Sequence, residues 1–288
     1  MQNGGPSRTA LGAARYRADH QRLDAARVFA DPLAIAVVEP DNDPQGGLTG
    51  ARTQAGDYLD EDARRRMRMF IAARSRYAED RLADAYRAGI RQLLILGAGL
   101  DTFAYRNPHP GLRVFEIDHP DTQVWKRKRL ADTGIEIPGT VSYLAADFER
   151  DTLAQVLAAG DVNPEQPAYV MWLGVTVYLT GEAIDATLGT LGGLGPGTEL
   201  VLDYGVPFTA VTAEQRAAVE VRERRLAAIG ERWISYFTPD QMAARLAAAG
   251  FTAAEDLSAG AVAARYLGDP SPADRPGPRL VRAVTHRA

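Results

Sequence analysis

The 288-residue chain contains no cysteine, and that absence removes several kinds of chemistry at once. Disulfides, thiolate metal sites and enzymes with a cysteine nucleophile are all excluded. Long apolar runs are missing too, because the longest, residues 170–179, is far shorter than the ~20 residues that cross a membrane. Residues 1–17 also lack the apolar core of a signal peptide, so we expect a soluble, cytoplasmic protein.

Basic charge is not in excess either. The chain has 33 Lys and Arg against 37 Asp and Glu, which gives a formal net charge of −4. Nucleic-acid binding depends on Lys and Arg that neutralise phosphates and release counterions, so we expect no nucleic-acid partner. The four histidines, His20, His109, His119 and His286, show neither HxxxH nor HxH spacing, which favours a site without a metal ion.

Short apolar runs that begin near residue 91 predict a parallel sheet. Each run has six residues or fewer, which is typical of a buried strand, and helical stretches separate most of them. Repeated strand–helix–strand units predict a doubly wound α/β fold. The seven predicted strands cover residues 93–96, 112–117, 141–145, 168–173, 200–202, 252–257 and 280–285.

Two parts of the chain depart from this alternation. Residues 1–88 contain no convincing strand, and their apolar residues have helical spacing around 20–38 and 59–88. We expect them to form a helical cap within the same globular unit as the sheet domain, residues 89–288. A helical stretch within residues 207–237 interrupts the pattern after the fifth strand, and we expect it to be an inserted lid.

The first predicted strand runs directly into a glycine turn, Gly97-Ala98-Gly99. Such a turn lets a ligand approach the backbone closely, at the strand edge where open α/β sheets bind ligands. Asp118 ends the next strand, at the position from which a carboxylate accepts hydrogen bonds from ribose hydroxyls. The two signals together predict a nucleoside site, with a helix cap as the alternative role for Asp118.

A third acid closes the third strand. Asp147 is placed to accept the exocyclic amine of adenine, while the ring of Phe148 covers the base. An ordinary helix cap and a core aromatic are the alternative roles of these two residues. Three successive strand ends therefore suit one adenosine.

Two residues in the glycine turn discriminate between nucleoside cofactors. A dinucleotide site usually has a third Gly or Ala in GxGxxG and a helix N-terminus free of acids, because a diphosphate binds there. Here Thr102 stands at the third position, and the charge of Asp101 would repel a diphosphate. S-adenosylmethionine instead carries an ammonium and a sulfonium group. The turn favours this methyl donor, with helix capping as the alternative role for Asp101.

Further motifs surround these residues, and together they resemble a known family. They are Ser7-Arg8-Thr9-Ala10, Asp31-Pro32-Leu33-Ala34, Ala73-Arg74-Ser75-Arg76, the stretch from Gly97 to Thr102, Tyr105-Arg106, the stretch from Phe115 to Pro120, Asp147-Phe148 and Val177-Tyr178-Leu179-Thr180. This set resembles the leucine carboxyl methyltransferase-like group of class I methyltransferases, which includes many actinobacterial O-methyltransferases. The resemblance covers most of the chain.

That resemblance implies a seven-stranded, mostly parallel, Rossmann-like methyltransferase sheet under an N-terminal helical cap, with S-adenosylmethionine as cofactor. From the sequence alone, Arg74 is more readily explained by solvation or by pairing on the face of its Arg-rich helix, and its role at the cofactor comes from the resemblance. The implied cofactor-binding residues are Arg74 at the donor's carboxylate, Gly97, Ala98, Gly99 and Asp101 in the turn, Asp118 at the ribose, and Asp147 with Phe148 at the adenine.

The acceptor side of the site is less determined. Members of the family often carry a glutamate where this chain has Leu173, so a contact to donor or acceptor is lost or supplied otherwise. Trp172, Tyr178 and Tyr204 are predicted to line the acceptor pocket, with core packing as their alternative. No catalytic residue is identified, and His119 is more readily explained as a surface or helix-capping residue.

The predicted function is methyl transfer from S-adenosylmethionine to a carboxyl or hydroxyl oxygen of a small molecule or a peptide. This displacement depends mainly on positioning and on exclusion of water. A carboxylate acceptor needs no general base, whereas a hydroxyl benefits from one, and the sequence does not choose between them. Two alternatives stay open: a nicotinamide-dependent oxidoreductase, and a non-catalytic binding module on a methyltransferase scaffold.

Overall fold

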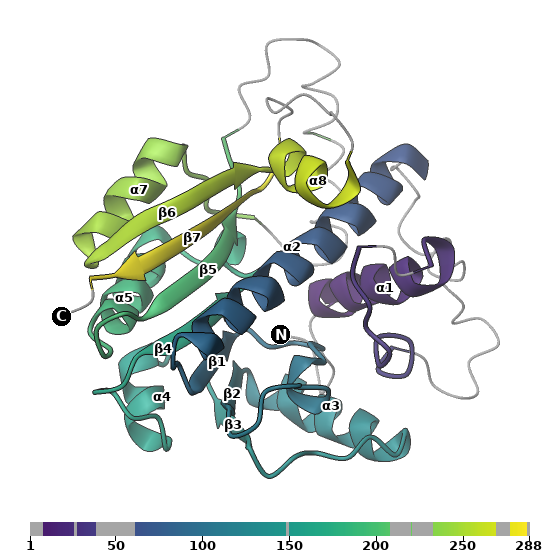
Figure 1. Ribbon diagram of the computed structural model, residues 1–288, viewed down its shortest axis with the longest axis horizontal. Coiled ribbons are helices and arrows are strands. Elements are labelled where there is room, and N and C mark those ends of the chain that lie inside the picture. Colours follow the sequence, from purple (N-terminus) through teal and green to yellow (C-terminus); the bar gives the residue numbers. More distant parts are fainter. Residues whose placement is uncertain are drawn as a thin grey trace.

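The computed structural model describes residues 8–25, 28–38, 61–147, 150–207, 220, 233–268 and 277–286. One seven-stranded sheet runs through it, in the order β3-β2-β1-β4-β5-β7-β6 (Figure 1). β7 is antiparallel to both of its neighbours, whereas the other neighbouring strands are parallel, which confirms the predicted sheet. The strands are β1 (Gln92–Leu96), β2 (Arg113–Asp118), β3 (Val141–Ala145), β4 (Ala168–Trp172), β5 (Glu199–Tyr204), β6 (Phe251–Ser258) and β7 (Arg279–Thr285).

Hydroxyl caps fix where several helices begin. Thr152, Thr180, Thr238 and Ser258 each accept a hydrogen bond from the backbone NH three residues later. None of the helices within the described ranges is long and apolar enough to cross a membrane. The helices are α1 (Arg8–Leu23), α2 (Glu61–Arg87), α3 (Pro120–Asp132), α4 (Leu153–Ala159), α5 (Gly181–Gly192), α7 (Pro239–Ala248) and α8 (Ala259–Leu267), with short 3₁₀ turns η2 (Phe103–Tyr105) and η3 (Thr176–Tyr178).

The first helix differs from the prediction in its bounds. The sequence predicts a helix around residues 20–38, but α1 ends at Leu23 and the chain then forms turns. His20 explains the change of direction, because its Nε2 accepts hydrogen bonds from the backbone NH groups of Val28 and Phe29, at 3.3 Å each. These NH groups would bond within the helix if α1 continued.

Helix α8 was missed by the sequence prediction, which has no helix between the last two strands. Ser258 caps its start through the backbone NH of Ala261, and Gly268 ends it in the left-handed region, at φ +62°. Of the predicted insertion within residues 207–237, only residues 207, 220 and 233–237 are described, so the predicted helix lies outside the described residues apart from residue 220.

Apolar clusters fill both faces of the sheet. Leu94 and Leu96 of β1 belong to a cluster shared with α4, α5 and α7, whereas Leu93 and Ile95 belong to one shared with α2 and α8. Figure 1 shows α2 crossing the sheet on this second face. A third cluster joins α1 to Leu100, just after β1, and to α3. The N-terminal helices therefore pack against the segment that follows the first strand.

Candidate functional site

The glycine turn after β1 is held by the neighbouring strand. The backbone NH groups of Gly97 and Ala98 donate to the carbonyl of Ile117 at 2.8 and 3.2 Å. Gly97 and Gly99 have φ angles of +63° and +46°, which only glycine adopts without strain. A Cβ on Gly97 would also lie 2.4 Å from Cγ2 of Val175. The turn therefore requires glycine and lies against the segment that follows β4.

Asp118 lies directly beside this turn. Its Oδ2 accepts a hydrogen bond from the backbone NH of Gly99, and its Oδ1 accepts one from the NH of His119 at 2.6 Å. Burial raises the pKa of Asp118, although both backbone hydrogen bonds oppose the rise. Each carboxylate oxygen keeps a lone pair for a further donor such as a ribose hydroxyl. The cap of α3 is His119, whose Nδ1 accepts from Asp121, so Asp118 does not have the alternative capping role.

Asp147 follows β3 at the same edge of the sheet. The backbone NH of Ala146 donates to the carbonyl of Asp118 at 2.9 Å, which brings the two strand ends together. Oδ2 of Asp147 lies 3.7 Å from Nε of Arg150. Phe148 lies outside the described residues, and the adenine contacts of both residues stay a prediction.

Asp101 bonds to the backbone at the start of η2, although Thr102 and not Asp101 occupies the N-cap position. Its Oδ1 accepts a hydrogen bond from the backbone NH of Phe103 at 2.8 Å, and its Oδ2 lies 3.8 Å from Nη1 of Arg17. Burial opposes ionisation of this carboxyl, but Arg17, Lys126 and Arg106 outweigh it, so its pKa lies below the ordinary value. The negative charge in the turn is thus balanced by the protein's own cations.

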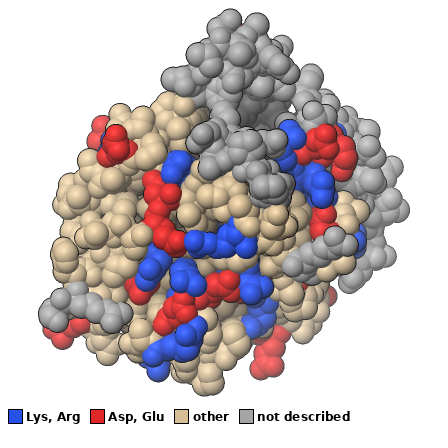
Figure 2. All heavy atoms as spheres, turned by 45° about the horizontal axis from the view of Figure 1, so that its top comes forward, with Lys and Arg blue, Asp and Glu red and all other residues tan. Residues whose placement is uncertain are grey.

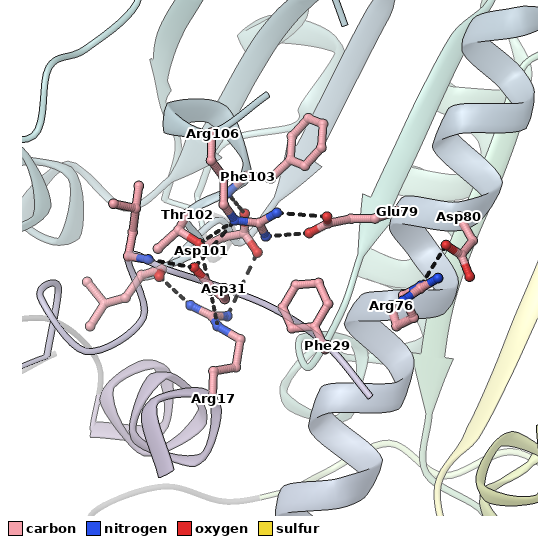
Figure 3. A network of polar contacts seen from close by, with 12 residues as sticks. Arg17, Phe29, Asp31, Arg76, Glu79, Asp80, Asp101, Thr102, Phe103 and Arg106 are labelled. Atoms are coloured by element: carbon pink, nitrogen blue, oxygen red, sulfur yellow. Dashed lines mark hydrogen bonds and ion pairs between the residues drawn. The ribbon is translucent and has the colours of Figure 1, made fainter. Parts of the chain in front are cut away.

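A network of charged side chains ties the N-terminal helices to this turn (Figure 3). Arg106 donates from Nη1 to Oε2 of Glu79 on α2 at 2.8 Å and lies 3.4 Å from Asp31. Thr102 donates its hydroxyl proton to Asp31 at 2.7 Å, and Arg17 of α1 lies 3.6 Å from the same carboxylate. Sequence reasoning noted Asp31 and Arg106 only as motif residues and did not find this network.

Arg74 of α2 reaches the other side of the turn, at the ends of β4 and β5. Its Nη1 donates to Oδ2 of Asp203, and Oδ1 of Asp203 accepts a 2.5 Å hydrogen bond from the backbone NH of Gly174. Arg74 is therefore paired, but across the fold rather than along its helix. Asp203 was missed, although an acid that ends an apolar strand is the same signal that identified Asp118. Leu173 packs against the apolar cluster on the α2 face of the sheet.

The predicted acceptor residues separate into two groups. Trp172 is 0% exposed in the core, and Tyr204 is 1% exposed with its hydroxyl donating to Asp256 at 2.7 Å. Both side chains are packed in the core. Tyr178 is half-buried in η3, and its hydroxyl accepts a 2.9 Å hydrogen bond from Nε1 of Trp233. A role for these residues at the acceptor stays a prediction.

The surface in Figure 2 bears on possible partners. On its part that is not grey, Lys and Arg lie next to Asp and Glu instead of forming a patch of one sign. This mixed pattern agrees with the formal net charge of −4. The described atoms of this face therefore form a mixed surface and not a patch of basic charge.

The residues at this edge fit a nucleoside joined to an amino acid. The glycine turn leaves its backbone open to close approach, and Asp118 supplies acceptors for hydroxyl groups. On the other side of the turn, Nε of Arg74 is buried without a hydrogen-bond partner among the described residues. A buried guanidinium nitrogen of this kind suits an anionic group such as a carboxylate.

Comparisons with known proteins point the same way. The family model described as leucine carboxyl methyltransferase matches residues 10–192, more than half of the chain. "Putative S-adenosyl-L-methionine-dependent methyltransferase YktD" of Bacillus subtilis (strain 168) is 30% identical over 278 residues, which cover 90% of each chain. A relative with the same description from Mycobacterium avium (strain 104) is 35% identical over 213 residues, 72% of this chain and 70% of that one.

Two solved structures have a similar fold. A putative methyltransferase from Thermobifida fusca YX has a TM-score of 0.59 at 18% identity, covering 99% of this chain and 97% of that one. A DUF574 family protein from Streptomyces avermitilis MA-4680 has a TM-score of 0.57 at 19% identity, covering 91% and 97%. Both support the class I methyltransferase fold expected from the sequence.

Proposed function

The chain belongs to the leucine carboxyl methyltransferase family, and from this premise we propose that it methylates a carboxyl or hydroxyl oxygen of a small molecule or peptide. It is a methyltransferase with S-adenosylmethionine as its methyl donor, so the oxidoreductase and the non-catalytic module are not retained. The observation that carries the proposal is the joining of the glycine turn to Asp118 at the carboxyl edge of β1 and β2.

The proposed donor site follows the strand ends. The backbone of the 97–99 turn lies beneath the methionine portion, Asp118 accepts the ribose hydroxyls, and Asp147 accepts the adenine amine. Arg74 pairs with the donor's carboxylate, while Asp101 holds the turn through its bond to Phe103. When bound, the donor supplies an electrophilic methyl group that is already activated. The chain therefore has to position the acceptor oxygen and exclude water.

Of the two acceptors, a carboxyl oxygen is the one that we favour. A carboxylate is already ionised near neutral pH and needs no base, whereas a hydroxyl has a proton to lose. Three of the four histidines have structural contacts of their own. His20 binds the backbone after α1, His109 stacks on Tyr86, His119 caps α3, and His286 follows β7, whose end pairs with the start of β5.

We also propose that the N-terminal helices and the sheet form one unit, in which residues 1–88 cover the donor. The ion pairs of Arg17 with Asp101, of Arg106 with Asp31 and of Arg74 with Asp203 support this arrangement. All three link residues before position 88 to the sheet domain or its turn. The lid role of residues 207–237 stays a prediction.

Two measurements test the proposal. Calorimetric titration with S-adenosylhomocysteine and with NAD⁺ should show binding of the first ligand only. Transfer of a labelled methyl group from S-adenosylmethionine to a panel of acids, phenols and peptides should then give a labelled product. A methyl ester releases its label as methanol in alkali, whereas a methyl ether does not. Alkali-stable label on nitrogen or carbon would contradict O-methylation.

A further inference from the structure

A buried ion pair between Arg74 and Asp203 lies at the carboxyl ends of β4 and β5. The proposed donor site gives a role to Arg74 but none to Asp203. Only 12% of the Arg74 side chain and 7% of the Asp203 side chain are exposed. Both oxygens of Asp203 are engaged, one by Nη1 of Arg74 and the other by the backbone NH of Gly174. The hydroxyl of Thr176 also donates to the carbonyl of Asp203 at 2.7 Å. The carboxylate is therefore held in one position.

Two glycines bring this pair next to the donor turn. Gly174 has a φ of +75°, and a Cβ there would lie 2.9 Å from Nη2 of Arg74. Gly174 directly precedes Val175, the residue that a Cβ on Gly97 would strike. The guanidinium, the carboxylate and the glycine turn thus meet at one corner of the sheet edge.

The pair is poorly explained as a stabilising contact. Removing two charges from water offsets most of their attraction, so a buried ion pair contributes little to stability. In a comparable pair at the other end of β5, Arg282 donates to Glu199 from both Nε and Nη2, at 3.0 and 2.8 Å. Nε of Arg74 has no such partner among the described residues. This difference indicates that Arg74 is arranged to bind a further anion.

We infer that Asp203 holds the ammonium group of the methyl donor, beside the carboxylate that the proposed donor site assigns to Arg74. An α-amino acid carries a carboxylate and an ammonium group on the same carbon, and a guanidinium beside a carboxylate matches both charges. Arg74 donates to the donor's carboxylate, and Asp203 accepts from its ammonium group. Leu173, which precedes Gly174, offers no charge, and Asp203 supplies the negative charge at this corner instead. The inference rests on the proposed donor site.

Two ligands separate this inference from the function on which it rests. S-adenosylhomocysteine carries the amino-acid headgroup, whereas 5′-methylthioadenosine keeps the nucleoside and the sulfur but lacks that group. The dissociation constants of both are measured by calorimetry for the wild type, Asp203→Asn and Arg74→Gln. Glu199→Gln is the matched control, because Glu199 is a buried carboxylate on the same strand and is also paired with an arginine.

Loss of a charged hydrogen bond should raise the dissociation constant of S-adenosylhomocysteine about tenfold or more in Asp203→Asn and Arg74→Gln. The dissociation constant of 5′-methylthioadenosine should stay within about threefold of the wild-type value. Glu199→Gln should lower the melting temperature and leave both dissociation constants unchanged. Equal weakening of both ligands in Asp203→Asn would show that Asp203 only maintains the strand edge, and would overturn the inference. Unchanged binding of S-adenosylhomocysteine would overturn it as well.

A variant that does not fold is replaced by the double variant Arg74→Gln/Asp203→Asn, which leaves no unpaired buried charge. The same ratio of the two dissociation constants is its readout, and an unchanged ratio counts against the inference. Failure of the wild type to bind either ligand would overturn the proposed function together with the inference. Wild-type binding of both, with an unaltered ratio in every variant, would overturn the inference alone.

Discussion

The two sides of the candidate donor site are built from different kinds of contact. At the ends of β1 and β2, backbone hydrogen bonds hold the 97–99 turn, and Asp118 is bonded to backbone NH groups. At the ends of β4 and β5, the site depends on two side chains that meet across the fold, Arg74 from α2 and Asp203 from β5. The first set of contacts joins two successive strands, whereas the ion pair joins residues that are 129 positions apart in the sequence.

The same contrast separates the turn from the N-terminal helices around it. Arg17, Asp31, Glu79 and Arg106 come from four separate segments and meet through charged contacts (Figure 3). Such contacts can be removed one at a time, and each removal leaves an opposite charge behind in a largely buried place. We therefore expect changes on the backbone side to destabilise the turn or to weaken binding of both ligands. Changes on the charged side should lower stability or weaken binding of one part of the ligand.

Removal of Arg106 is expected to have the largest effect. Arg106→Met leaves Glu79 and Asp31 without this cation, and burial already raises the pKa of Glu79. We expect the free energy of unfolding to fall by about 3–5 kcal/mol, as for other broken buried pairs, in a urea titration. Arg76→Met is the control, because the Arg76–Asp80 pair in Figure 3 has the same chemistry but is 49% and 33% exposed. If both variants lost a similar free energy of unfolding, burial of the Arg106 pairs would not be the cause of the effect.

Alteration of the backbone side is tested by Gly97→Ala. A positive φ costs a non-glycine residue about 1–2 kcal/mol, and overpacking against Val175 adds about 1–3 kcal/mol. Unfolding should therefore require about 2–5 kcal/mol less than in the wild type, by the same titration. Gly111→Ala is the control, since Gly111 has a φ of +73° but nothing within 4 Å of its ideal Cβ position. Equal effects would show that only the φ angle matters at Gly97.

The same contrast explains what the sequence could predict. The strands, the glycine turn and Asp118 follow from local patterns: apolar runs, φ requirements and an acid at a strand end. Asp203 had the same local signal but was not recognised, because its partner Arg74 is 129 residues away. The side chain of His20 accepts hydrogen bonds from residues eight and nine positions later, and these contacts turn the chain after α1. Helical periodicity of apolar residues does not predict such contacts. Contacts between distant side chains are set by packing of the complete fold, so no single motif reveals them.

Asp118→Ala tests the backbone side of the site through its affinity for ligands. The ribose hydroxyls would lose a buried acceptor, so affinity should fall by about 1–3 kcal/mol for both S-adenosylhomocysteine and 5′-methylthioadenosine. Asp203→Asn should affect only the first of these ligands, so calorimetry with both distinguishes the two sides of the site. Asp132→Ala is the control, because Asp132 is an exposed acid that pairs with Lys128 on α3. Unchanged affinity in Asp118→Ala would show that the ribose is held elsewhere.

The smallest expected effect concerns Asp19 on α1, a partly buried carboxyl whose charge is only partly compensated by nearby arginines. Burial raises the pKa of Asp19 to about 6, Arg68, Arg22 and Arg15 oppose the rise only in part, and Oδ1 has no hydrogen-bond partner among the described residues. Above pH 6 the folded protein therefore carries an ionised carboxyl that water would solvate better. Asp19→Asn removes this cost, so we expect it to stabilise the protein by about 1 kcal/mol at pH 7.5.

The stability gained in Asp19→Asn should depend on pH in a predictable direction. Because the folded pKa of Asp19 is raised, the wild type binds an extra proton on folding between the unfolded and folded values, and its stability falls as the pH rises through that window. The advantage of Asp19→Asn should thus be complete above pH 6 and disappear toward pH 4. His20, whose pKa is lowered by burial, destabilises both proteins as the pH falls below 6.5, so only their difference in melting temperature isolates Asp19. A difference that does not change with pH would mean that Asp19 is ionised at no cost, and that charges on α1 are as well solvated as those at the surface.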